Sequence, residues 1–112
     1  MDAEKDPKTY LGHIVESCEI IEEYLRDISI NDFFKNRQLQ DSVIRRLEII
    51  GEAAKYISED FKKLHQEIPW RKMTGLRDVL IHEYFGIDNN LVWGTIKDNL
   101  PRVKEQLKKL LF

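Results

Sequence analysis

The sequence is poor in the residues that build cross-links, turns and membrane spans. A single cysteine, Cys18, excludes a disulfide within the chain. Five glycines and three prolines are too few for a turn-rich β architecture. Uninterrupted apolar runs, such as residues 79–81 and 110–112, are short, whereas a helix that crosses a bilayer needs about 20 apolar residues. These shortages argue against a disulfide scaffold and against a membrane-spanning helix in this sequence.

What the sequence does contain favours a small helical domain. Hydrophobic residues make up 42% of the 112 residues and charged residues 34%, which is typical of a globular protein. A chain of this length buries roughly 65% of its unfolded surface in one core and is too short for two cores. The N-terminal residues are polar and unpatterned, so we expect a flexible tail over residues 1–7 and a single domain over residues 8–112. The N-terminus has no basic segment followed by an apolar one, which predicts a cytoplasmic protein.

The charges are unevenly distributed along the chain. The formal net charge is −2, which gives no general attraction to nucleic acid. Residues 1–34 hold nine acids and three bases, whereas residues 35–112 hold eleven acids and fifteen bases. Residues 61–82 hold five bases and two acids. We expect an anionic ligand to be steered to that stretch, although a solvated helix face would give the same excess.

Two apolar stripes with helical spacing occupy the first half of the chain. The first predicts a helix over about residues 8–28, followed by a break at residues 29–32, and consists of Leu11, Ile14, Cys18, Ile21, Leu25 and Ile28. The second runs from Val43 through Leu47, Ile50, Ala54, Ile57 and Phe61 to Leu64. Together they predict an antiparallel helical hairpin. Gly51 falls in the middle of the helix that the second stripe predicts, where a small residue would let another backbone come close, from this chain or from a second subunit.

Two further helices are expected in the second half. One begins near Pro69, buries Met73, Leu76, Leu80 and either Tyr84 or Phe85, and is capped by Gly86. The last begins after Asp88 as N-cap, carries an apolar stripe from Val92 to Leu110, and breaks near residues 99–101 because of Pro101. The predicted fold is therefore all-α, an up-and-down bundle of four to five helices.

The motifs of many enzyme classes are missing. The chain has no glycine-rich phosphate loop, no pair of cysteines, no HExxH and no G-x-S-x-G elbow, so we expect neither a metal site nor a bound cofactor. His13 and His65 are isolated from other ligand types in the sequence, which favours surface or edge histidines over metal ligands. Trp70 and Trp93 have the character of packing residues.

Residues 70–84 are the exception, because they gather an arginine, a histidine and a tyrosine on one helix. Asp78 and His82 share a helix face, so Asp78 could orient the imidazole. Arg77 and His82 lie about 140° apart around the axis. They therefore converge on a ligand only through the length of the arginine side chain or across a contact with a second chain.

These residue types suit RNA cleavage without a metal. An imidazole can move the protons of the 2′-hydroxyl and the leaving oxygen, and a guanidinium can stabilise the charge on phosphorus. One imidazole cannot serve both proton transfers, whereas a symmetric dimer would supply two copies of His82 and Arg77. The alternative is structural, with Arg77 and Asp78 as a surface ion pair and His82 as a helix-end cation.

The same stretch resembles the HEPN superfamily and within it the HepT toxin branch. The signature of that branch is Arg, four to six residues, His, any residue and Tyr, which here corresponds to Arg77, His82 and Tyr84. The resemblance covers roughly residues 8–111 and includes residues 47–55, 68–70, 75–77 and 87–101.

The resemblance implies a HEPN-like helical-bundle homodimer that cleaves RNA without a metal, with Arg77 and His82 of both subunits in a shared cleft. It also implies a type VII-like toxin-antitoxin pair. The partner would be a minimal nucleotidyltransferase antitoxin that transfers AMP to Tyr84, adding negative charge and bulk to a cleft built for phosphate.

One position departs from the family pattern, because Asp78 stands where many relatives have Asn. The acid would favour protonated His82 and repel phosphate, which affects the expected pH optimum and rate. Two other readings stay open. The dimer could bind nucleotide or RNA without cutting it, as a partner subunit of a minimal nucleotidyltransferase, or the chain could be a purely structural bundle in a larger complex.

Overall fold

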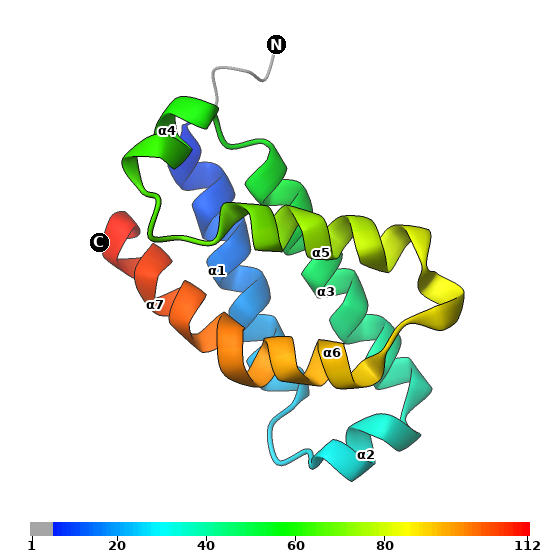
Figure 1. The fold of residues 1–112 in the computed structure, drawn as a ribbon. Helices are drawn as coiled ribbons and strands as arrows, with labels where there is room; N and C mark the ends of the chain where they lie inside the picture. The colour runs from blue at the N-terminus through cyan, green and yellow to red at the C-terminus, as the bar shows by residue number, and fades with distance from the viewer. Residues whose placement is uncertain (1–5) are drawn as a thin grey trace.

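The computed structural model describes residues 6–112 apart from the side chain of Tyr84, and every regular element in that range is helical. The elements are α1 (Pro7–Tyr24), α2 (Ile30–Lys35), α3 (Arg37–Lys55), α4 (Glu59–Leu64), α5 (Trp70–His82), the 3-10 turn η1 (Tyr84–Gly86), α6 (Asn89–Gly94), the π-helical turn η2 (Thr95–Asn99) and α7 (Leu100–Leu111). Figure 1 shows α1 and α3 as one antiparallel pair, and α5 with the α6–α7 rod as another. The predicted all-α bundle is confirmed. None of the helices described is long and apolar enough to span a membrane.

Helix α1 is shorter than its apolar periodicity predicts. It begins at Pro7, where the Asp6 side chain accepts a hydrogen bond from the backbone N–H of Lys8 at 2.9 Å, and it ends at Tyr24 rather than near residue 28. Asp27 has a φ of 59°, a left-handed conformation that a right-handed helix does not contain. Of the tail expected over residues 1–7, residues 1–5 lie outside the part that the structure describes.

Two short helices, α2 and α4, lie where the apolar stripes predicted a break and the end of a longer helix. The expected break at residues 29–32 is instead the start of α2, because Ser29 and Asp32 form a capping box. The second stripe does not make one helix. It is interrupted after Lys55, and Ser58 starts α4 by accepting the N–H of Phe61 at 3.2 Å. Leu64, expected in the core, is 78% exposed.

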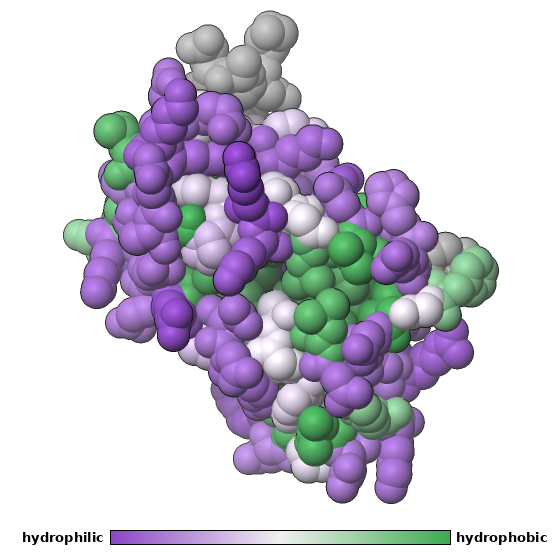
Figure 2. All heavy atoms as spheres, in the orientation of Figure 1, coloured by the Kyte–Doolittle hydropathy of each residue, from purple (hydrophilic) through white to green (hydrophobic). Residues whose placement is uncertain are grey.

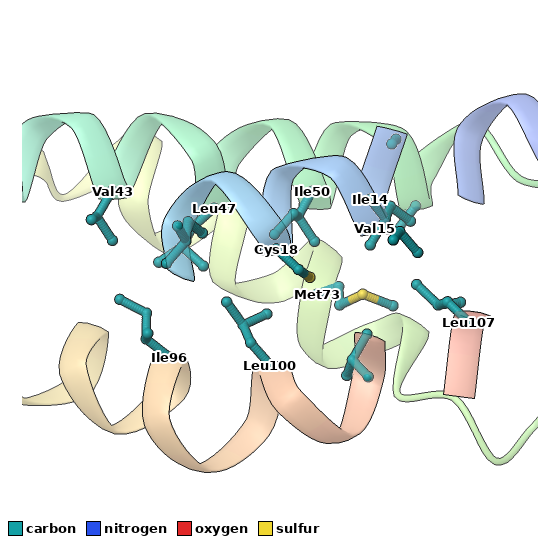
Figure 3. Packing of buried hydrophobic residues seen from close by; sticks show 14 of the residues in the cluster. Ile14, Val15, Cys18, Val43, Leu47, Ile50, Met73, Ile96, Leu100 and Leu107 are labelled. Atoms are coloured by element: carbon teal, nitrogen blue, oxygen red, sulfur yellow. The ribbon is translucent and has the colours of Figure 1, made fainter. Parts of the chain in front are cut away.

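Helix α3 is the centre of the fold and packs against α1 and α5. Apolar side chains from α1, α3, α5, η2 and α7 meet in one core, as Figure 3 shows for Cys18, Leu47, Met73, Ile96 and Leu107, among others. The close neighbour that Gly51 admits is α5 of the same chain. A Cβ at Gly51 would lie 2.7 Å from the Met73 carbonyl oxygen and would overlap the Cβ of Arg77.

The C-terminal half follows the prediction in the last helix but not at the end of α5. Asp88 caps α6, its Oδ1 accepting the N–H of Asn90 at 2.9 Å. The π-helical turn η2 ends at Asn99, two residues before Pro101, which has no N–H to continue the α-helical pattern. Gly86 does not cap α5. That helix ends at His82 with Glu83 as its C-cap, and Gly86 is the last residue of the 3-10 turn η1 that follows. Phe85 is 92% exposed rather than buried.

Candidate active site

Arg77 is held at the contact between α5 and α3, with 21% of its side chain exposed. Its Nη2 lies 2.8 Å from Oε2 of Glu52 on α3, and its Nη1 lies 2.9 Å from Oδ1 of Asp78. The pKa of Arg77 is raised above its ordinary value, first by the hydrogen bond to Asp78 and further by the charge of Glu52. Its Nε is buried without a hydrogen-bond partner among the described residues. The guanidinium is therefore charged and fixed in position.

His82 is the last residue of α5 and is exposed to solvent. Its Nδ1 lies 2.9 Å from the backbone carbonyl oxygen of Asp78, one helical turn earlier. A carbonyl oxygen can only accept a hydrogen bond, so Nδ1 carries the proton. In the neutral ring Nε2 is then the unprotonated nitrogen, which is the form that a general base requires.

Asp78 supports the two residues in a way that the sequence did not reveal. The i, i+4 spacing predicts its carboxylate beside His82. In the structure the carboxylate is bound to Arg77, and the backbone carbonyl makes the contact with His82. Asp78 therefore contacts both residues at once, through its side chain and its main chain.

A groove of about 470 Å³ opens beside Arg77, between α1, α3 and α5. It is lined by Tyr10, His13, Arg45, Glu48, Ile49, Glu52, Ala53, Tyr56, Arg77 and Ile81. The rings of Tyr10 and Tyr56 are stacked, with centroids 5.7 Å apart. Arg77 lines this groove and His82 does not, so one chain does not bring both residues into the same hollow.

His13 is an exposed histidine, as predicted, and it lines the same groove as Arg77. Arg45 and Glu52 also lie there, and no spacing in the sequence connects them with α5. The one sequence signal was Gly51, since a glycine inside a helix marks a close approach and Glu52 follows it directly. His65 is half-buried, and the centroid of its ring lies 4.6 Å from that of Phe61.

The basic stretch over residues 61–82 does not gather around the groove, and the acidic face of α1 pairs with α7. Of the five bases in residues 61–82, only Arg77 lines the groove. The acidic face of α1 is partly neutralised by α7, where Lys104 lies 2.8 Å from Glu22 and Lys108 lies 3.1 Å from Glu19. In the described part of the chain, no three His, Cys, Asp or Glu side chains gather in the way that metal ligands do. The side chain of Tyr84, the expected AMP acceptor, lies outside the described residues.

Comparison with known proteins gives one consistent result. The model of the family described as "Ribonuclease HepT-like" matches residues 14–110. A protein of Thermococcus cleftensis named "Probable ribonuclease HepT" is 52% identical over 103 residues, which are 92% of this chain and 94% of that protein. A "Putative RNase" of Caldanaerobacter subterraneus subsp. tengcongensis is 42% identical over 107 residues, 96% of each chain.

A longer relative is also similar to this chain. The Methanocaldococcus jannaschii protein named "Gamma-glutamylcyclotransferase and putative RNase" is 48% identical over 107 residues, which are 96% of this chain and 48% of that protein. This chain therefore spans about half the length of that relative. No solved structure is significantly similar to this chain.

Proposed function

Because the chain belongs to the HepT-like family of ribonucleases, we propose that it is an endoribonuclease in which Arg77 and His82 cleave RNA without a metal ion. The observation that carries the proposal is the hydrogen bond of 2.9 Å from His82 Nδ1 to the Asp78 carbonyl oxygen. It leaves Nε2 free for proton transfer, on the helix that also holds a fixed and charged guanidinium.

The proposed reaction is a transesterification within the RNA strand. A neutral imidazole removes the proton of a 2′-hydroxyl, and the oxygen bonds to the adjacent phosphorus. The bond from phosphorus to the 5′-oxygen breaks, and an imidazolium protonates that oxygen. The products are a 2′,3′-cyclic phosphate and a 5′-hydroxyl end. Arg77 stabilises the charge that develops on the phosphoryl oxygens.

The proton balance requires two imidazoles, which a homodimer would supply in a composite site. The solvent-facing side of α5 supports this arrangement, because Val79 and Ile81, on either side of His82 around the helix axis, are 42% and 40% exposed. Figure 2 shows apolar side chains gathered between α5 and α6, where Leu91 is 47% exposed. A second copy of the chain packed on this side of α5 would cover these residues and bring two copies of His82 together.

The biological role that we propose is that of a toxin in a toxin-antitoxin pair. Its partner would be a nucleotidyltransferase that transfers AMP to the hydroxyl of Tyr84, two residues after His82. An adenylate at this position would place a negative charge close to the residues that bind phosphate.

The two ion pairs of Arg77 favour a second function, binding without cleavage. Its guanidinium is bound to the carboxylates of Glu52 and Asp78, and these acids compete with an incoming phosphate. A non-catalytic subunit that binds nucleotide or RNA beside a nucleotidyltransferase would need Arg77 as a ligand but would not need the free Nε2 of His82.

Cleavage of a single-stranded RNA in the presence of EDTA tests the catalytic proposal. We expect 5′-hydroxyl and cyclic phosphate ends from the wild type, and a loss of about 10² to 10⁴ in rate for His82→Ala. His65→Ala is the matched control, since it removes a histidine that packs against Phe61 away from the groove. Undiminished cleavage by His82→Ala would overturn the mechanism. RNA binding without cleavage by the wild type would establish the second function.

Induced expression in cells tests the biological role. The wild type should arrest growth, and His82→Ala should not. Co-expression with a minimal nucleotidyltransferase as the proposed partner should restore growth and add adenylyl mass to the wild type but not to Tyr84→Phe. A wild type that is harmless alone and unmodified with its partner would contradict the toxin role.

A further inference from the structure

A second hollow lies on the N-terminal half of α3 and is strongly basic. Its volume is about 580 Å³, and three arginines line it, Arg37, Arg45 and Arg46. Tyr24 at the end of α1 lies beside them, and Asp41 is the one acidic residue in its lining. The hollow therefore combines an excess of positive charge with an aromatic ring.

Arg45 connects this hollow to the groove of Arg77, because it lines both. The connection follows from the register of α3, where Arg37, Arg45 and Glu52 follow one another at intervals of about two turns on one face. Figure 1 shows α3 as one uninterrupted helix that passes behind α5. A ligand that follows this face from Arg37 would reach the Glu52–Arg77 pair.

The arginines of the hollow are available to an anion. Arg37 and Arg46 form no ion pair within the described residues, and Arg45, 70% exposed, has only a contact of 3.5 Å to Glu48. An exposed pair at this distance contributes little free energy. The acids Glu19 and Glu22 of α1 are bound by lysines of α7 and do not compete.

The arrangement fits a polymer of phosphates better than a single anion. Arg37 and Arg46 are separated by about 14 Å along the helix axis, which is more than one phosphate can bridge. Guanidinium groups bind phosphate oxygens in a bidentate way. Tyr24 is 39% exposed beside the arginines, and Tyr56 is 62% exposed at the Arg77 end. Exposed rings along a basic track are the features that bind unpaired bases.

We propose that the face of α3 from Arg37 to Arg45, with Arg46 and Tyr24, binds a single RNA strand by its phosphates and leads it into the groove of Arg77. The proposal rests on the proposed ribonuclease function and extends it. It assigns to α3 the part of the substrate on one side of the scissile bond.

Salt-dependent binding of a fluorescent single-stranded RNA, measured by anisotropy in a His82→Ala background, tests this track while the RNA stays intact. Substituting Arg37, Arg45 and Arg46 by Gln together should weaken binding and lower the slope of log K against log salt by about 2, since each contact with a single strand contributes about 0.7. Arg102→Gln on α7 is the matched control and should leave the slope unchanged. Tyr24→Ala should weaken binding without changing the slope.

Each result separates this proposal from the ribonuclease function. An unchanged slope in the triple variant overturns the track, even if the wild type cleaves RNA. A reduced slope supports the track, even if the wild type cleaves nothing. Equal affinity for a duplex of the same sequence overturns the single-strand assignment. Thermal unfolding of the triple variant shows that the comparison is made between folded proteins.

Discussion

The chemistry of the candidate site depends on which atoms of Asp78 face its neighbours. The carboxylate lies on Arg77, and the carbonyl oxygen fixes the tautomer of His82. A charge that would repel phosphate is therefore bound directly to the arginine that would attract it.

Asp78→Asn should strengthen RNA binding, because it removes a negative charge at the phosphate site and keeps the backbone contact to His82. A charge at this distance in a solvated site is worth about 1 kcal/mol, which is roughly fivefold in affinity. Anisotropy with uncleaved RNA measures it, and Asp98→Asn removes an exposed charge elsewhere as a control. Equal affinities in wild type and Asp78→Asn would show that the carboxylate does not oppose the ligand.

The buried thiol of Cys18 should make stability fall in alkaline solution. Burial, together with the charge of Glu22, raises the pKa of Cys18 from 9.0 to about 12 in the folded chain. Below pH 9 the thiol is protonated in both the folded and the unfolded state. Between these two values only the unfolded chain ionises, so the free energy of unfolding decreases by on the order of 1 kcal/mol per pH unit.

Urea unfolding of wild type and Cys18→Ala across this pH range isolates the effect of the thiol. Below pH 9 the variant should be less stable than the wild type because it leaves a small cavity, but its decline above pH 9 should be shallower. Parallel pH profiles for the two proteins would contradict the buried, protonated thiol.

At the scale of elements, the contact of α3 with α5 determines where Arg77 lies. Gly51 brings the two backbones together, and the ion pair of Glu52 with Arg77 is formed next to it. The signals that a sequence carries about such a contact are limited. The glycine shows that something approaches closely, but the partner lies in a different part of the chain and is selected by packing.

Gly51→Ala should destabilise the protein by about 1 to 3 kcal/mol, because the added methyl group overlaps Arg77 and the Met73 carbonyl. Gly12→Ala is the matched control, since a Cβ there has no neighbour within 4 Å. It should stabilise α1 by up to about 1 kcal/mol through helix propensity. Thermal unfolding measures both, and similar shifts in the two variants would contradict the close contact.

At the scale of the whole molecule, the two signature residues are separated within one chain. Arg77 lines the groove, and His82 lies on the solvent-facing side of α5, flanked by exposed apolar residues. The groove also contains an imidazole of the same chain, His13. In the proposed mechanism, the second proton-transfer group would come from the His82 of a partner or from His13.

A heterodimer of wild type and His82→Ala, purified through two different tags, distinguishes these sources. If two copies of His82 share one cleft, its activity should fall far below half that of the wild type. Half of the activity would indicate that each chain has its own site, with His13 as the second group. His13→Ala then provides the control, with little effect in the first case and a large loss in the second.

Many features of the helices could be predicted from the sequence because they depend on local interactions. Apolar spacing identifies the helix faces, Asp88 and Pro101 mark the start and the break of the last helix, and the spacing of Arg77 and His82 places both on α5, because these effects act within a few turns. The apolar stripes missed the ends of α1 and the division after Lys55, although the caps at Asp6 and Ser58 and the backbone of Asp27 are local features. The gathering of Arg45, Glu52 and His13 around Arg77 was decided by the tertiary structure. It depends on packing between segments that are distant in the chain, and no local pattern encodes which helices will meet.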